Sequence, residues 1–287
     1  MPDTPSTLAR QMWRTLEPYH GLVYFTPRAA EAYARLGIED QAGYFASRAA
    51  ALGPVPAEVV VATFYNFDPR VVRAAIPAAW HVTTPAELVE ARRAAADVAL
   101  REVLGDEVVV SDDMVAAAEA ARRAAGACTQ EGRPLYAAHA ALPWPDEPHM
   151  VLWHATTLLR EFRGDGHIAA LVGEGIDGCE SLVTHGASDS LVTLDGLRAS
   201  RGWSDDAWGA ARERLRARGW LDGGDALTPE GAAARARVER LTDERAMAPW
   251  RALGEDECAR LRRTVRPWSR AVVESGAFGR VIASRGE

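Results

Sequence analysis

The sequence predicts a mainly α-helical protein with short β-hairpin wings, built as two tandem winged-helix-like repeats related by a pseudo-twofold axis. Three observations predict this fold. The same landmarks recur in the same order in both halves of the chain, matching helix starts carry matching capping signals, and a segment rich in glycine and proline separates the halves. We therefore expect a first repeat over 1–127, a linker over 128–148 and a second repeat over 149–287.

The first landmarks are two helical patterns that open at Trp13 and at Trp153. One passes a turn at Thr26-Pro27 and the other a turn at Gly164-Asp165-Gly166. They then reach similar segments, Leu36-Gly37-Ile38-Glu39-Asp40 and Glu174-Gly175-Ile176-Asp177. We interpret each pair of patterns as equivalent helices of the two repeats.

The next landmarks indicate a helix-turn-helix pair in each half. Its second helix is predicted to run from Asp68-Pro69 to Trp80 in the first half and from Ser204-Asp205 to Trp220 in the second, each with an N-cap residue. A threonine followed by proline then starts a long helix at Thr84 and at Thr228, and Glu87 completes a capping box. Asp222-Gly223-Gly224-Asp225 is a turn of the kind that joins two short strands.

Composition is that of a folded globular protein, with 48% apolar and 25% charged residues in 287. No apolar run approaches the roughly 20 residues that span a bilayer, and the N-terminus lacks the order of a signal peptide. We therefore expect a cytoplasmic protein without a membrane partner. The three cysteines are far apart, which favours free thiols over a disulfide framework or a structural zinc site.

This order of helices resembles winged-helix regulators of the MarR type, which are normally homodimers of one such unit. The segments from Trp153-His154 through Arg160 to His167, and Asp177-Gly178-Cys179-Glu180, are also similar to an uncharacterised actinobacterial helix-turn-helix family. The resemblance covers most of the chain. It implies the fold and a single-chain pseudo-dimer, and it implies no particular activity.

Charge disfavours DNA as a partner. All 33 basic residues are arginine, the net charge is −7, and Asp205 and Asp206 begin the predicted recognition helix of the second half. The arginines at Arg212, Arg214 and Arg216 repeat every two residues, so they divide between opposite faces of a helix. A solvated arginine face is the simpler interpretation, and a MarR-like DNA-binding regulator is kept as an alternative.

A crevice between the repeats is the predicted ligand site, because ligands favour such interfaces. The first half contributes aromatic and histidine side chains, and the second half contributes the densest polar cluster in the chain. The predicted ligand-binding residues are Trp13, His20, Tyr24, Trp153, His154, Arg160, Arg163, Asp165 and His167. In this hypothesis an arginine holds an anionic or carbonyl group, aromatic rings stack on the ligand, and His167 or His20 transfers a proton. The alternative interpretation of the polar cluster is structural: Asp165 caps the next helix and Arg163 pairs with Glu161.

Sequence motifs assign neither a cofactor nor a metal. The seven histidines lack tight ligand spacing, no glycine-rich segment follows a strand as a phosphate loop would, and no Gly-x-Ser-x-Gly nucleophile motif occurs. The leading prediction is a protein that binds a small aromatic or anionic metabolite, as a monomer or weak dimer. An enzyme that acts on such a metabolite by histidine and arginine acid–base chemistry is the second prediction.

Overall fold

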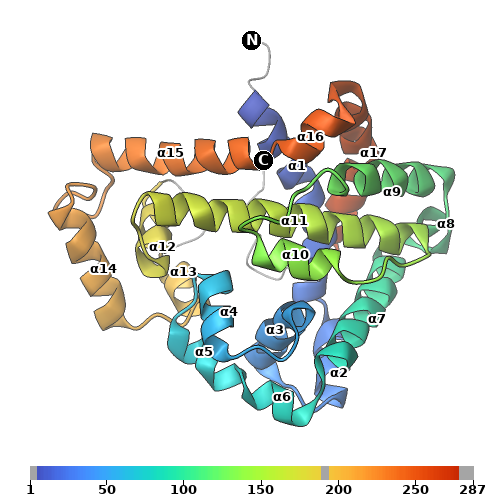
Figure 1. The fold of residues 1–287 in the computed structure, drawn as a ribbon, viewed down its shortest axis with the longest axis horizontal. Helices are drawn as coiled ribbons and strands as arrows, with labels where there is room; N and C mark the ends of the chain where they lie inside the picture. Colours follow the sequence, from blue (N-terminus) through green and yellow to red (C-terminus); the bar gives the residue numbers. More distant parts are fainter. Residues whose placement is uncertain (1–4, 189–193, 278–287) are drawn as a thin grey trace.

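The computed structural model describes residues 5–188 and 194–277, and within these ranges the regular secondary structure is helical (Figure 1). The only β-type pairing there is an isolated antiparallel bridge between Leu221 and Leu227. The predicted mainly α fold is confirmed, and the predicted hairpin wings are not formed.

The helices follow one another with short connections. Those before the central helix are α1 (Pro5–Gly21), η1 (Leu22–Tyr24), α2 (Pro27–Arg35), α3 (Asp40–Ala49), η2 (Ala50–Leu52), α4 (Ala57–Phe64), α5 (Pro69–Ala75), α6 (Ala78–Val82), α7 (Pro85–Leu104), α8 (Asp106–Val109), α9 (Asp112–Ala125) and α10 (Pro134–Ala140). The remainder are α11 (Pro148–Gly173), α12 (Gly178–Gly186), α13 (Leu194–Ser200), α14 (Asp205–Ala217), α15 (Pro229–Arg245), α16 (Ala248–Leu253) and α17 (Glu255–Glu274).

Short polar side chains fix where several helices begin. Each accepts a hydrogen bond from a backbone N–H of the first turn, which would otherwise lack an intrahelical acceptor. Thr84 forms the predicted capping box with Glu87, and the predicted caps at Asp68, Ser204 and Thr228 are all present. Thr26, which was predicted only as part of a turn, caps α2. The capped helix starts of the sequence prediction are therefore confirmed, whereas the helices predicted to open at Trp13 and Trp153 begin earlier, at Pro5 and Pro148.

The central element is α11, a single helix of 26 residues that crosses the middle of the molecule (Figure 1). It packs against α1, α7, α9, α10 and α15. The turn predicted at Gly164-Asp165-Gly166 is wrong, since these residues lie inside α11. Gly166 serves packing instead, because a Cβ atom there would lie 2.8 Å from Nη1 of Arg133.

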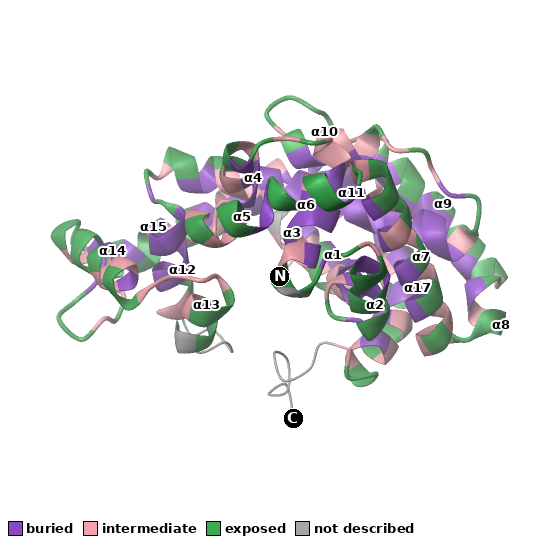
Figure 2. Cartoon of the chain, turned by 90° about the horizontal axis from the view of Figure 1, so that it is seen from below, coloured by how far each residue is buried: buried purple, intermediate pink, exposed green. Residues whose placement is uncertain are grey.

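Two apolar cores lie along α11, and they do not follow the predicted repeats (Figure 2). The larger core combines residues from Ala9 to Phe162 with residues from Ala246 to Val272. The smaller core contains residues from Ala170 to Val238. Because α17 packs on α1, α7 and α9, the C-terminal helices belong with the first half of the chain. The predicted tandem repeat is thus not seen.

The smaller core has the order predicted for a helix-turn-helix unit, with α12, α13 and α14 followed by a tight turn and α15. The turn does not extend into strands. Oδ1 of Asp222 accepts hydrogen bonds from the backbone N–H groups of Gly224 and Ala226, and the chain then enters the Thr228 cap of α15. In the first half, Pro77 separates α5 from α6 and shortens the predicted helix, since proline lacks the N–H that the helix needs.

The predicted linker is partly structured. It contains α10, in which Leu135, Tyr136 and His139 are buried, and α10 packs along α11. Proline and glycine in 128–148 therefore mark the ends of a short helix as well as loops.

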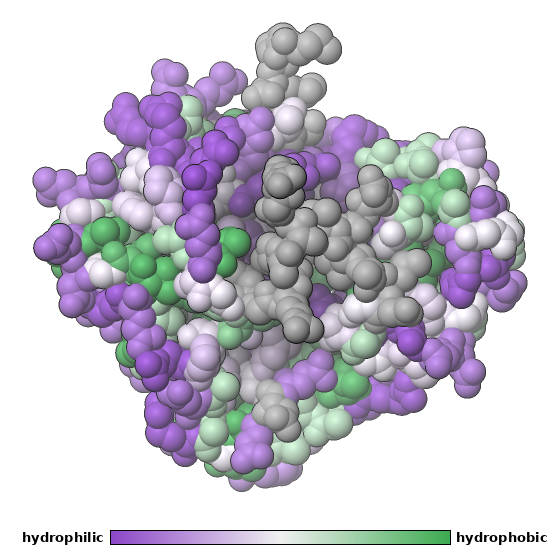
Figure 3. All heavy atoms as spheres, turned by 180° about the vertical axis from the view of Figure 1, so that it is seen from behind, coloured by the Kyte–Doolittle hydropathy of each residue, from purple (hydrophilic) through white to green (hydrophobic). Residues whose placement is uncertain are grey.

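No single helix among residues 5–188 and 194–277 is long and apolar enough to cross a membrane. One helix pair, Gln41–Leu52 with Ala57–Phe64, passes the same test of length and composition together and is bent by 96°. On the rear face, hydrophobic side chains lie in separate groups among hydrophilic ones (Figure 3).

Candidate functional site

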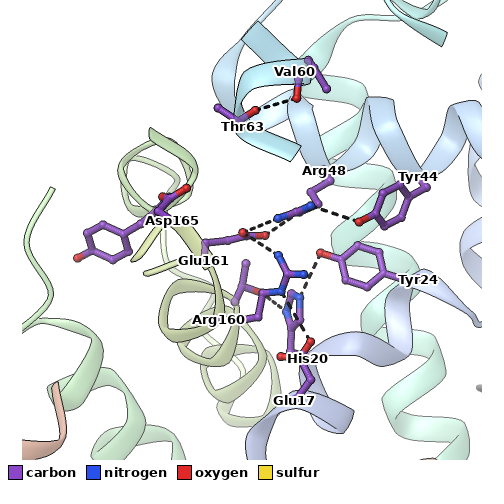
Figure 4. Close-up of polar contacts among 12 residues, drawn as sticks. Glu17, His20, Tyr24, Tyr44, Arg48, Val60, Thr63, Arg160, Glu161 and Asp165 are labelled. Carbon is purple, nitrogen blue, oxygen red and sulfur yellow. Dashed lines mark hydrogen bonds and ion pairs between the residues drawn. The ribbon is translucent and has the colours of Figure 1, made fainter. Parts of the chain in front are cut away.

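A buried ion cluster lies where α3 meets α11 (Figure 4). Nε and Nη2 of Arg48 donate to the two carboxylate oxygens of Glu161 at 2.9 and 2.8 Å, and Nη1 of Arg160 donates to Oε2 of Glu161 at 2.9 Å. The side chain of Glu161 is 0% exposed. Burial alone would raise the pKa of Glu161, but the guanidinium groups of Arg160 and Arg48 hold it well below its usual range. One buried carboxylate therefore pairs with two guanidinium groups and neutralises the charge of only one of them.

Tyr44 lies beside this cluster because it is one helical turn before Arg48 on α3. Nη1 of Arg48 donates to its hydroxyl at 3.2 Å. Burial acts to raise the pKa of Tyr44, yet the nearby guanidinium groups of Arg48, Arg160 and Arg201 lower it overall. A lowered tyrosine pKa in a protein interior is a common property of functional sites.

Glu17 brings α1 to the cluster. Its carboxylate lies 3.7 Å from Nε of Arg160 and accepts a 3.0 Å hydrogen bond from Nε1 of Trp13, one turn earlier on the same helix. Burial raises the pKa of Glu17 in spite of the neighbouring Arg160. This carboxyl group is therefore easier to protonate than an ordinary glutamate.

A chain of hydrogen bonds leads from His20 to Arg92, and it fixes the tautomer of the imidazole. Oγ1 of Thr157 donates its single proton to the Trp153 carbonyl at 3.0 Å, so it accepts from Nδ1 of His20 at 3.0 Å. Nε2 of His20 then accepts from the Tyr24 hydroxyl at 3.1 Å, and Nη2 of Arg92 donates to Tyr24 at 3.0 Å. Burial and the charges of Arg160 and Arg92 lower the pKa of His20 well below its usual value, so the imidazole is neutral at neutral pH.

Three predicted ligand-binding residues line one small pocket between α1, α11 and α16. Trp13, Arg160 and Arg163 lie there with Glu17 and Trp250. The pocket encloses about 20 Å³, room for about one ordered water. We call it the tryptophan pocket. Nη2 of Arg163 lies 2.7 Å from Asp243 on α15, and its guanidinium carbon lies 5.0 Å from the centroid of the Trp13 ring.

Two more predicted residues, Trp153 and His154, line a second pocket of about 20 Å³ on the other side of α11. Arg92 and His139 also line it, so we call it the Arg92 pocket. His20 and Tyr24 line neither pocket and lie in the hydrogen-bond chain. The nine predicted residues therefore do not form a single site.

Asp165 points away from the ion cluster (Figure 4) and caps a helix. Its Oδ2 accepts from the backbone N–H of Tyr136 at 3.0 Å, in the first turn of α10. The structural interpretation of Asp165 as a helix cap is therefore correct, but the helix that it caps is α10 rather than the next helix along the chain. Burial raises the pKa of Asp165 to about 6. The predicted pairing of Arg163 with Glu161 is also replaced, since Arg163 pairs with Asp243 and Glu161 with Arg48.

His167 lies two turns beyond Arg160 on the same face of α11, in contact with α15. The separation along the helix axis is roughly 10 Å. Thr242 donates to the Val238 carbonyl at 2.7 Å, so Nδ1 of His167 donates to Thr242 at 2.9 Å. Burial, with the charge of Arg235, lowers the pKa of His167 to about 4. The proton-transfer role predicted for His167 or His20 is therefore disfavoured near neutral pH.

Several residues of this site were not predicted. They are Glu17, Tyr44, Arg48, Arg92 and Trp250. The spacing of four between Tyr44 and Arg48 was a readable signal for two side chains on one helix face. Arginine is so common in this chain that the sequence did not distinguish buried guanidinium groups from exposed ones.

The arginines of α14 are used within the protein. Arg212 and Arg216 both pair with Asp225 in the turn, and Arg214 pairs with Asp177 and Glu180 at 2.6 and 2.7 Å. These pairs leave a helix whose basic groups already have acidic partners, an arrangement that disfavours binding to phosphates.

The described residues contain no group of three or more His, Cys, Asp or Glu side chains that could hold a metal ion. Cys128, Cys179 and Cys258 are free, as predicted.

The fold and the site together define an all-α protein with a polar network buried along its central helix. Residues 9–279 match the model of a helix-turn-helix family, so the chain belongs to that family. No curated protein and no solved structure matches the chain. The resemblance to a helix-turn-helix family is therefore confirmed, and the actinobacterial source stays a prediction.

Proposed function

We propose that this protein binds a small molecule with an aromatic ring and a carboxylate or carbonyl group, in the tryptophan pocket. One observation carries the proposal. Nη1 of Arg163 is buried in the wall of this pocket and has no hydrogen-bond partner among the described residues. A buried donor without an acceptor is costly, and an oxygen atom of a ligand would remove that cost.

The walls of the pocket suit the rest of such a molecule. Trp13 is 36% exposed and Trp250 is buried, so an aromatic ring that entered beside Trp13 would be covered by indole on two sides. Arg160, whose side chain is 24% exposed, supplies a second guanidinium group. Since the closed pocket has room for about one water, the exposed Trp13 side chain must move to admit a ring.

A thermal-shift titration tests the proposal, with indole-3-acetate, phenylacetate and benzoate as probes at pH 7 and constant ionic strength. We expect at least one probe to raise the melting temperature with saturation. Arg163→Met and Arg160→Ala should each weaken the response tenfold or more, because each removes a donor to the carboxylate. Arg251→Met is the matched control, since it removes an exposed arginine on α16 that does not line the pocket. Equal responses in all four proteins would contradict the proposal.

An enzyme acting on a similar molecule is the second candidate, and the lowered pKa of Tyr44 favours it. In such an enzyme Tyr44 would act as the acid or base, with Arg48 beside it stabilising the phenolate. The test is an ultraviolet titration of tyrosinate in wild type and Tyr44→Phe. A phenol that ionises below pH 10 only in wild type would support the role, and identical titrations would exclude it.

A further inference from the structure

Buried polar atoms without partners gather around the Arg92 pocket. Arg92, His139 and His154 are 3%, 3% and 5% exposed. Among the described residues, Nε and Nη1 of Arg92, Nε2 of His139 and Nε2 of His154 all lack a hydrogen-bond partner. These three side chains come from α7, α10 and α11, and all three line the same pocket. So many neighbouring buried polar atoms without hydrogen-bond partners are unusual in a protein interior.

The charge of this pocket is positive. Arg92 and Arg93 line it, and within the described part of the chain none of its lining residues is acidic. Glu161, which influences Arg92, already forms ion pairs with Arg48 and Arg160. The guanidinium group of Arg92 is instead placed over aromatic rings, 4.7 Å from the centroid of Tyr24 and 5.5 Å from that of Trp153. A buried cation without a counter-ion is expensive, and ring faces compensate it only partly.

We propose that the Arg92 pocket binds one small carboxylate, held by Arg92 and by the ring N–H groups of His139 and His154. The carboxylate is either a free ion of the size of formate or the end of a larger molecule. The volume of about 20 Å³ has room for about one water, so the half-buried Leu142 in the pocket wall must shift slightly to admit the three heavy atoms of a carboxylate.

Carboxylate fits this pocket better than water or a multivalent anion does. Water would satisfy the imidazoles but would leave the charge of Arg92 uncompensated. Burial lowers the pKa of His139 to about 3 and that of His154 to about 4, so both rings are neutral at pH 7 and the pocket holds the charge of Arg92 with that of the more exposed Arg93. A dianion would exceed the charge of the buried guanidinium.

Equilibrium dialysis of the full chain against labelled formate and labelled acetate tests this site at pH 7, with ionic strength fixed by sodium chloride. We expect saturable binding of one carboxylate per chain. Arg92→Met should weaken it tenfold or more. Because Arg92 also donates to Tyr24 and that variant could unfold, Leu142→Trp is the second variant. Leu142 is half-buried in the pocket wall, so a tryptophan there should fill the space and abolish binding without touching the polar groups.

Arg251→Met, matched in charge to Arg92→Met, should bind as wild type does. Phenylacetate in a parallel dialysis distinguishes the two sources of the carboxylate, a free ion and the end of a larger molecule. Binding of formate or acetate indicates a free ion, whereas binding of phenylacetate alone that Leu142→Trp abolishes indicates the end of a larger ligand. The absence of saturable binding overturns the proposal, as does binding that folded Leu142→Trp retains. Since Arg163 does not line the Arg92 pocket, folded Arg163→Met should still bind the carboxylate there, which separates this result from the test of the proposed function.

Discussion

Glu161 holds together charges that would otherwise repel one another. Arg48 comes from α3 and Arg160 from α11, and both donate to this one carboxylate inside the larger core (Figure 4). Removing one partner of a buried ion pair leaves the other charged and desolvated, which costs more than the pair itself contributes. The arrangement therefore ties α3 to α11 through a single residue.

Glu161→Gln should lower the free energy of unfolding by about 3–5 kcal/mol, because the buried Arg48 and the partly exposed Arg160 lose their counter-ion. In that background, Arg48→Met should cost less than it does in wild type, since the unpaired cation is removed. Urea denaturation of the two single variants and the double variant measures this coupling. Additive effects would show that the ion pair is not the reason for the loss.

Asp165 makes the stability of the protein depend on pH, because burial disfavours its charged carboxylate. Its pKa is raised to about 6 from an ordinary value near 3.8, so the folded protein holds a proton there that the unfolded chain releases. Folding is therefore favoured by this group at low pH, and that contribution is lost as pH rises from about 4 to 6. Asp165→Asn keeps an oxygen for the Tyr136 N–H and removes the charge.

The stability of Asp165→Asn relative to wild type should accordingly increase between pH 4 and pH 6, by about 1–3 kcal/mol at most. Chemical denaturation of both proteins at several pH values gives this difference and cancels the groups that they share. A difference that does not vary with pH would contradict the raised pKa.

At the scale of elements, Gly178 sets how closely α12 approaches the end of α4. A Cβ atom at Gly178 would lie 1.9 Å from the carbonyl oxygen of Tyr65, which is backbone and cannot rotate away. The Tyr65 hydroxyl donates to the Ile176 carbonyl at 2.5 Å, so the contact is also made by hydrogen bonding. The smaller core is joined to the first half of the chain at this point.

Gly178→Ala should therefore destabilise the protein by several kcal/mol, in the manner of an overpacked interior. Gly209→Ala is the matched control, because Gly209 lies inside α14 with no atom within 4 Å of an added Cβ. That variant should be more stable by up to about 1 kcal/mol, since alanine favours helix. Melting temperatures compare the two, and an equal shift for both would disprove the close contact.

The elements also show which sequence signals were informative. Thr84, Ser204 and Thr228 were predicted as caps because a cap acts within one turn of helix, and all three are caps. Gly164 and Gly166 indicated a turn, yet both lie inside α11, where Gly166 packs against Arg133 from a distant part of the chain. Local signals were read correctly where the physical cause was local.

At the scale of the whole molecule, the difference between local signals and long-range packing explains why a tandem repeat was predicted. Gly37 and Gly175 both adopt positive φ after a helix, and the buried Ile38 and Ile176 follow with the same backbone hydrogen-bond pattern. These shared landmarks are the ordinary end of a helix, which recurs in any helical chain. Which helices pack together is decided by long-range contacts, and α17 packs on α1.

Some residues of the candidate site were predicted from the sequence, and others were missed. Trp13, Arg160 and Arg163 do meet in one pocket, since helical spacing placed the two arginines on one face of α11. Arg48 and Arg92 were missed because their burial results from the packing of α3 and α7 against the rest of the core.

Acid should unfold the molecule cooperatively. His139 has a pKa of about 3 and His154 and His167 of about 4, all below the usual 6.5, so the unfolded chain binds protons that the folded protein does not. The stability these groups contribute is present above about pH 6.5 and is lost as pH falls. Between pH 6.5 and 5 each group should cost up to about 2 kcal/mol. Circular dichroism during denaturation at each pH measures this, and constant stability down to pH 4.5 would contradict the lowered pKa values.

Native mass spectrometry tests directly whether a ligand binds in the tryptophan pocket. The purified chain is titrated with indole-3-acetate, phenylacetate and benzoate, and its native mass is compared with its denatured mass. We expect a one-to-one adduct with at least one of these probes that persists in Arg251→Met and is lost in Arg163→Met. No adduct with any probe, or an adduct of equal intensity in Arg163→Met, would contradict it.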